Sequence, residues 1–343
     1  YFYALSSNKN IKIIIYNQVN ILIPWNGLGR MHDKYVIADD SLYILGGRNT
    51  FGYFLGDYAG HKNYDRDVLV YNTGSKDSSI YQIKDYYKKI TSQKCCSVFH
   101  YNESLGEKNS VKKAEQELKN RYESLENKYG KFLTENYDYK ANTYETNKIN
   151  LLSNPTSLYA KQPTVYYGLM YLAKNAKKEV KIHTPYIICN DYMYNELKNI
   201  KVPTTIMTNS AENNGNIFGA VDYLNHKKDI INTGVTIKEY EGGISYHGKS
   251  MTIDDDIAIV GSFNMDMRSA YIDTELMLVI NSKDINKQLK ASMEEYEKKA
   301  ATVKNETEYS HIPEGMKMKE LSDKKKNIKA WFGWAMNGLR FLF

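Results

Sequence analysis

Apolar and polar positions follow two patterns along this chain. The apolar run 11–16 predicts a buried strand, and 34–38 and 42–45 predict two strands joined by a turn at 39–41. Apolar residues spaced three or four apart predict a helix over 79–92. The same two patterns predict helices over 163–178 and 281–302 and strands over 179–188, 202–209 and 236–240. Strands that alternate with helices indicate an α/β fold.

Two segments differ in composition from the rest. Residues 103–150 are rich in charge and in strong helix formers, which predicts a solvated helix and a linker rather than a coiled coil for a partner. A second domain then starts near Leu151. The tail, 303–343, places Lys324–Lys326 before an aromatic stretch. Such a segment lies in a membrane interface or docks as a helix on the protein's own core, and both alternatives stay open.

Composition narrows the class of protein. The 343 residues are 42% hydrophobic and 25% charged, as in a folded protein of about two domains. Lys+Arg 46 and Asp+Glu 40 give a net charge of +6, which favours a phosphate-rich partner such as an anionic membrane surface or nucleic acid. No apolar run is long enough to span a bilayer. The three cysteines do not make a disulfide framework.

An internal repeat carries the chemistry. Residues 32–49 align without a gap to 247–264, with His, Lys, Asp, Ile, Gly and Asn at matching positions. Hydrophobic patterning does not require polar identities of this kind. Because residues i and i+2 of a strand share a face, His32 projects beside Lys34 and His247 beside Lys249. An imidazole beside an ammonium binds phosphate, and two histidines supply a nucleophile and an acid/base.

Further polar residues complete the predicted site. Asn49 and Asn264 supply neutral donors, and each histidine needs a carboxylate to orient its other nitrogen. Asp67 and Glu275, at the starts of two apolar strands, are the predicted orienting residues. Asp266 and Arg268 are expected to form a structural salt bridge near the site. The remaining histidines lack metal-ligand spacing and are expected at the surface or in structural roles, with His183 the one placed to line the cleft: 61, 100, 183, 226 and 311.

The doubled His-x-Lys motif, with its following Asp, Gly and Asn, resembles the phospholipase D superfamily. Segments 184–187, 214–225, 247–255 and 261–275 look like its bacterial cardiolipin synthase-like branch, and the resemblance covers nearly the whole chain. It implies two α/β halves, each a mixed sheet flanked by helices, related by a pseudo-two-fold axis. One active site between the halves needs neither metal nor cofactor and forms a phosphohistidine.

The resemblance also assigns residues to roles. Asp39 and Asp254 belong to the motif but are expected to brace its turn. His32 is assigned as nucleophile and His247 as acid. The implied catalytic residues are His32, Lys34, Asn49, Asp67, His247, Lys249, Asn264 and Glu275.

The leading functional hypothesis is phosphatidyl transfer. Phosphatidylglycerol would be both donor and acceptor, giving cardiolipin and glycerol, and water as acceptor would make the enzyme a phospholipase D. A nuclease of the same superfamily is the second hypothesis, although no dense Lys/Arg stripe flanks either motif, and a non-catalytic scaffold is the third. We expect a phospholipid substrate and a membrane surface as partners, without nucleic acid or an obligatory protein partner.

The two repeat-bearing halves are unequal in length. The strand predicted over 179–188 precedes the second motif, but the short stretch before His32 leaves no room for its counterpart. The predicted domains are therefore a first half, 1–150, truncated at its N-terminus, a second half, 151–302, and the tail. The expected location is the bacterial cytoplasmic membrane, peripherally or through an anchor missing from this chain.

Overall fold

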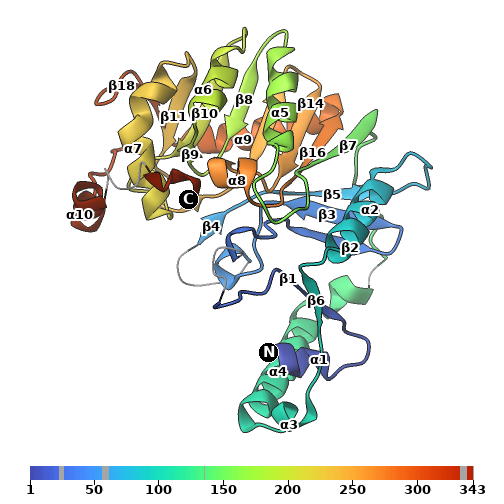
Figure 1. The fold of residues 1–343 in the computed structure, drawn as a ribbon. Helices are drawn as coiled ribbons and strands as arrows, with labels where there is room; N and C mark the ends of the chain where they lie inside the picture. Colours follow the sequence, from blue (N-terminus) through green and yellow to red (C-terminus); the bar gives the residue numbers. More distant parts are fainter. Residues whose placement is uncertain (23–26, 56–61, 135, 333–337, 343) are drawn as a thin grey trace. The chain divides into compact units, whose positions relative to one another are not determined.

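The computed structural model describes residues 1–22, 27–55, 62–134, 136–332 and 338–342 (Figure 1). It contains two compact units. The smaller unit comprises residues 1–27 and 86–143, and the larger unit comprises 28–85 and 144–343. Every residue that the sequence predicts for the catalytic site lies in the larger unit.

The described part of the smaller unit contains a strand pair and several helices. Strand β1 (Ile13–Tyr16) pairs antiparallel with β6 (Cys96–Phe99). The rings of Phe2 and Tyr3 pack edge-on against Phe99. The helices are α1 (Phe2–Ser6), α3 (Glu103–Gly106) and α4 (Asn109–Thr134). The helix predicted in the charged segment is confirmed by α4, whereas β6 was not predicted.

A sheet of nine strands dominates the described part of the larger unit. Its order is β18-β17-β11-β10-β8-β13-β14-β16-β7. The bounds are β7 Lys148–Ser153, β8 Val180–His183, β10 Thr204–Asn209, β11 Thr236–Tyr240, β13 Ser250–Ile253, β14 Ile257–Gly261, β16 Leu276–Asn281, β17 Ala300–Val303 and β18 Tyr309–His311. Strands β8, β10 and β11 are parallel, and β13, β14, β16 and β7 continue the sheet antiparallel.

Helices cover this sheet on both faces (Figure 1). Successive side chains of β8 point to opposite faces of the sheet. Val180 and Ile182 lie on one face, where they pack in an apolar core with residues of the covering helices. Lys181 and His183 point the other way and contact Glu294 and Glu297 of α9. The helices of the first face are α5 (Thr164–Lys174), α6 (Asp191–Lys198) and α7 (Ile217–Ile231), and α9 (Lys283–Glu297) covers the second.

A second, three-stranded sheet repeats part of the first. Its strands are β2 (Tyr35–Ala38), β3 (Leu42–Gly46) and β5 (Asp67–Tyr71), followed by α2 (Ser79–Thr91). The register is the same in the two copies, since Val36 pairs with Ile44 as Met251 pairs with Ile259. This repeat within a mixed α/β architecture confirms the predicted fold of two similar halves.

Some predicted elements differ in detail. The predicted helix over 281–302 ends at Glu297, and Ala300–Val303 instead forms β17 along the edge of β11. The predicted strand over 179–188 divides into β8 and β9 (Ile187–Ile188), because β9 leaves the main sheet to pair with β15 (Met265–Asp266). Helices α6 and α7 were not predicted. Asn190 and Asn216 cap them by accepting from backbone N–H groups of their first turns.

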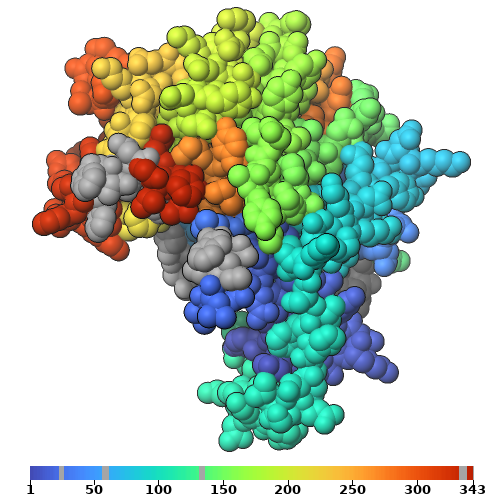
Figure 2. Space-filling model, viewed as in Figure 1, coloured from blue at the N-terminus to red at the C-terminus, as the bar shows by residue number. Residues whose placement is uncertain are grey.

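Lys325 and Arg340 join the end of the C-terminal tail to the rest of the larger unit. Lys325 of α10 (Asp323–Phe332) is buried and its Nζ donates to the backbone oxygens of Ala211 and Glu212. Arg340, in the turn Arg340–Leu342, pairs with Asp222 of α7 at 2.8 Å. Figure 2 shows this red turn against the orange surface of α8 (Met267–Tyr271). These contacts correspond to the docked alternative, although Trp331 is largely exposed.

Candidate active site

The two halves exchange strand pairs at the motif histidines. Strand β12 (Ser245–Tyr246), which leads into His247, pairs with β4 (Asn63–Tyr64) of the first half. In the same way Met31, just before His32, forms a bridge with Thr274 of the second half. Each histidine is therefore positioned by backbone from the opposite half.

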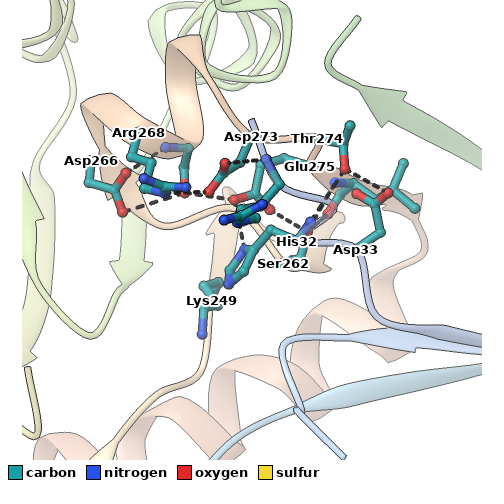
Figure 3. A network of polar contacts seen from close by, with 12 residues as sticks. His32, Asp33, Lys249, Ser262, Asp266, Arg268, Asp273, Thr274 and Glu275 are labelled. Atoms are coloured by element: carbon teal, nitrogen blue, oxygen red, sulfur yellow. Dashed lines mark hydrogen bonds and ion pairs between the residues drawn. The ribbon is translucent and has the colours of Figure 1, made fainter. Parts of the chain in front are cut away.

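The same exchange supplies each histidine with a carboxylate. Nδ1 of His32 lies 2.8 Å from Oε1 of Glu275, and Nδ1 of His247 lies 2.7 Å from Oδ2 of Asp65. Figure 3 shows Glu275 reaching His32, with Thr274 beside Asp33. An ionised carboxylate only accepts hydrogen bonds, so Nδ1–H of each ring donates and Nε2 keeps its lone pair.

The sequence-based choice of Asp67 as an orienting residue is wrong. Asp67 accepts from Nε of Arg48 at 2.6 Å, and Asp65 takes the predicted place. Strand register explains the difference: Gly46 pairs with Asp67 and its repeat counterpart Gly261 pairs with Met277, so the position equivalent to Glu275 is Asp65. Aligning 65–71 with 275–281 by their apolar strands reveals this equivalence in the sequence itself.

The two motif lysines have matching positions. Nζ of Lys34 donates to the backbone oxygen of His32, and Nζ of Lys249 donates to that of His247. The Lys249 ammonium also lies 2.6 Å from Nδ1 and 3.2 Å from Nε2 of His247. Burial, with Lys249 as the nearby positive charge, lowers the pKa of Lys34 to about 8. Two ammonium groups beside two imidazoles make a site suited to an anion.

These surroundings keep both imidazoles neutral near pH 7. Burial and then the charge of Lys249 lower the pKa of His247 to about 4. Burial and then Lys34 place the pKa of His32 well below its usual value. A phosphate anion bound between the lysines would offset their charge and favour protonation of an imidazole.

The two orienting carboxylates differ in their electrostatics. Burial raises the pKa of Glu275 to about 7, although Ser269 Oγ donates to Oε1 at 2.6 Å and Ser262 Oγ donates to Oε2. Burial acts to raise the pKa of Asp65 as well, but Lys249 and the hydrogen bond of His247 outweigh it, so that pKa is below its usual value. Asp65 is therefore the better partner for an imidazolium.

The two motif asparagines lie in different surroundings. Asn264 is buried, and its Oδ1 has no hydrogen-bond partner among the described residues. Asn49 is half-buried just after β3. A buried amide oxygen without a partner is available to accept a hydrogen bond from a substrate hydroxyl.

The motif aspartates lie at the turns, away from the imidazoles. Asp39 and Asp254 both have positive φ angles, 50° and 51°. Asp254 accepts from the backbone N–H groups of Lys177 and Lys178, at 2.9 and 2.7 Å. It thus fastens the β13–β14 turn to the chain before β8, which is a bracing contact.

The salt bridge expected between Arg268 and Asp266 forms instead between Arg268 and Asp273. Arg268 pairs with Asp273 at 2.8 Å, and Asp266 instead accepts from the backbone N–H of Ser269 at the start of α8. The Arg268 guanidinium also donates to the backbone oxygen of Leu28, which ties the segment before the first motif to the second half.

His183 forms part of a buried chain of polar groups. Its Nε2 lies 3.2 Å from Glu297, and its Nδ1 lies 3.3 Å from the hydroxyl of Tyr246, which accepts from Arg66. Burial lowers the pKa of His183 to about 4. Among the other histidines, His226 lies near Asp222 and His61 is outside the described residues. No cluster of His, Cys, Asp and Glu within the described ranges is arranged to hold a metal ion.

Asp65, Thr274, Arg66 and Phe54 are among the described site residues that the sequence did not predict. Asp65 and Thr274 contact the histidine segments directly, Thr274 Oγ1 accepting from the backbone N–H of His32 at 3.3 Å. Arg66 donates to Tyr246 and to Ser250, the neighbours of His247 and Lys249. The fourth is Phe54, which packs edge-on against the His247 ring. Their positions depend on contacts between the halves, which a linear motif does not contain.

Comparison with known proteins gives a family match that includes the second motif. Residues 169–296 match the family described as "Cardiolipin synthase, PLD-like domain". This part of the chain is therefore similar to a phospholipase D-like domain. Cardiolipin synthase 1 of Staphylococcus epidermidis is 30% identical over 159 residues, which cover 46% of this chain and 32% of that protein.

Two further similarities extend over more of the chain. An uncharacterized protein of Helicobacter pylori is 25% identical over 332 residues, covering 85% of this chain and 64% of that protein. Phosphatidylserine synthase of Haemophilus influenzae has the same fold, with a TM-score of 0.61 at 15% identity over 92% of this chain and 72% of that chain. The chain spans less than two thirds of the length of these curated relatives.

Proposed function

We propose that this protein transfers a phosphatidyl group from a glycerophospholipid to an alcohol through a phosphohistidine, with phosphatidylglycerol as donor and acceptor. The observation that carries the proposal is the pair of His-x-Lys motifs, in which each Nδ1 donates to a carboxylate of the other half. In this proposal both Nε2 atoms act on one phosphate, and the two lysines balance its charge.

In the first step Nε2 of His32 attacks phosphorus. The N–P bond forms as the bond from phosphorus to the headgroup oxygen breaks, and His247 gives its Nε2 proton to that oxygen. The ionised Asp65 supports this assignment, because it stabilises the imidazolium form of His247 that the substrate anion promotes. Lys34 and Lys249 balance the charge on the phosphoryl oxygens.

In the second step the acceptor alcohol replaces the leaving alcohol. Neutral His247 takes the proton of the acceptor hydroxyl as its oxygen attacks phosphorus, and the bond to His32 Nε2 breaks. A second phosphatidylglycerol as acceptor yields cardiolipin and glycerol, and water yields phosphatidic acid. The two outcomes use the same residues and differ in the acceptor.

The test is a product assay with the purified protein in chelator. Vesicles of labelled phosphatidylglycerol should yield labelled cardiolipin with release of glycerol. Phosphatidic acid as the only labelled product would make the protein a phospholipase D. Cleavage of single-stranded DNA without lipid turnover would overturn the proposal, and turnover that requires added metal would overturn its mechanism.

A lipid substrate also places the protein at a membrane surface. We propose peripheral association with the bacterial cytoplasmic membrane for this part of the chain. No helix within the described residues has the length and apolarity needed to cross a bilayer. Sedimentation with anionic vesicles tests the association, and a protein that stays in the supernatant would contradict it.

A further inference from the structure

A row of aromatic rings connects the protein surface with His247. Phe51 and Tyr53 are stacked, with ring centroids 5.5 Å apart and planes 3° from parallel. Tyr53 contacts Phe54 at 5.0 Å, and Phe54 meets the His247 ring edge-on at 5.0 Å. Phe54 is buried, whereas Phe51 at the outer end is 60% exposed and the adjacent Leu55 is 50% exposed.

Arg48 fixes this row against the catalytic carboxylate. Its NH1 donates to the backbone oxygen of Phe54 at 2.7 Å, and its NH2 donates to that of Asp65 at 2.8 Å. Its Nε pairs with Asp67. The outer rings thus have a defined position relative to the reacting imidazole, as a binding surface for part of a substrate requires.

Exposed rings and an aliphatic side chain suit hydrocarbon better than a nucleic acid strand. Bases also stack on aromatic rings, but a strand needs cations along its phosphates. Arg48, the cation that contacts the row among the described residues, is committed to Asp67 and to backbone oxygens. Exposed Leu55 favours acyl chains, because an acyl chain that covers this side chain removes apolar surface from water and so stabilises the complex.

We propose that Phe51, Tyr53 and Leu55 bind the glycerol backbone and first acyl carbons of a phospholipid whose phosphate lies at His247. The inference rests on the proposed function and deepens it by assigning the surface that selects a lipid. Small phosphodiesters reach the same histidines without touching this surface. The rate on vesicles relative to the rate on a soluble phosphodiester is therefore the quantity that reports on it.

The experiment compares the double variant Phe51→Ser/Leu55→Ser with wild type on phosphatidylglycerol vesicles and on bis(4-nitrophenyl) phosphate. We expect the ratio of the two rates to fall about tenfold or more, which corresponds to about 1.4 kcal/mol per tenfold. Ile312→Ser, which removes a similarly exposed aliphatic side chain elsewhere in the larger unit, is the matched control and should keep the ratio. Leu55→Ser alone should show a smaller fall in the same direction if the double variant folds poorly.

The outcomes separate this inference from the proposed function. An unchanged ratio in a variant that unfolds at the wild-type temperature would overturn the inference and leave phosphatidyl transfer intact. If the double variant lost activity on single-stranded DNA but kept its activity on lipid, the inference would be overturned in favour of bases stacking on these rings. A wild-type protein that turns over no lipid would overturn both.

Discussion

Exchanging Asp65 for asparagine should disable the enzyme more than the same exchange at Asp67. The Asp65 carboxylate is fully buried and lies 2.7 Å from Nδ1 of His247, whereas Asp67 pairs with Arg48. An imidazolium and a carboxylate about 4 Å apart, centre to centre, attract by about 4 kcal/mol at an effective dielectric constant of about 20. An asparagine amide also donates to Nδ1 and stabilises the wrong tautomer.

The expected result for Asp65→Asn is therefore a loss of roughly a thousandfold in kcat. Asp67→Asn changes the same chemical group two residues away and should cost less than about tenfold, because it touches no imidazole. Both variants are assayed for initial rates of headgroup release from phosphatidylglycerol vesicles, with circular dichroism and thermal unfolding as controls for folding. The reasoning would be refuted if Asp67→Asn lost a thousandfold while Asp65→Asn stayed within threefold of wild type.

Three further predictions follow from the contacts described above. His32→Ala and His247→Ala should each abolish turnover, but only His247→Ala should accumulate a phosphohistidine detectable by mass spectrometry; accumulation in His32→Ala would reverse the assigned roles. Because the pKa of Glu275 is raised to about 7, its contribution to stability is complete below about pH 4.5 and is lost as pH rises through 7. In urea unfolding between pH 5 and 7.5, Glu275→Gln should reduce the pH dependence of the free energy of unfolding by about 3 kcal/mol at most. If that pH dependence were unchanged in the variant, another group would be responsible for it. Arg340→Ala leaves the buried Asp222 carboxylate without its main cation and should lower the free energy of unfolding by about 3 kcal/mol, whereas a tail that does not dock would give no change.

The lipid-binding role of the tail stays a prediction. Its basic and aromatic residues suit a membrane interface, and Trp331 is exposed in the structure. Lys325 and Arg340 are nevertheless held by the larger unit, so deletion of 324–343 removes internal contacts as well as any membrane contact. Vesicle binding by such a truncated protein is interpretable only beside its unfolding temperature.

Much of this protein follows from its sequence because the information is local. Strand alternation predicts the motif hairpins, and the repeat of 32–49 in 247–264 predicts two equivalent halves with a histidine and a lysine on each. Side chains two positions apart on a strand share a face whatever the rest of the fold does. The structure accordingly places His32 near Lys34 and His247 near Lys249.

Only the tertiary structure decided which side chains and backbone groups of one half contact the other half. Alignment of the two strands makes Asp65 equivalent to Glu275, but only the packing of the halves brings each carboxylate to the histidine of the other half. The pairings of Tyr64 with Tyr246 and of Met31 with Thr274 join segments remote in sequence. Such contacts depend on how complementary surfaces pack and pair their backbone groups, and no local pattern encodes that choice.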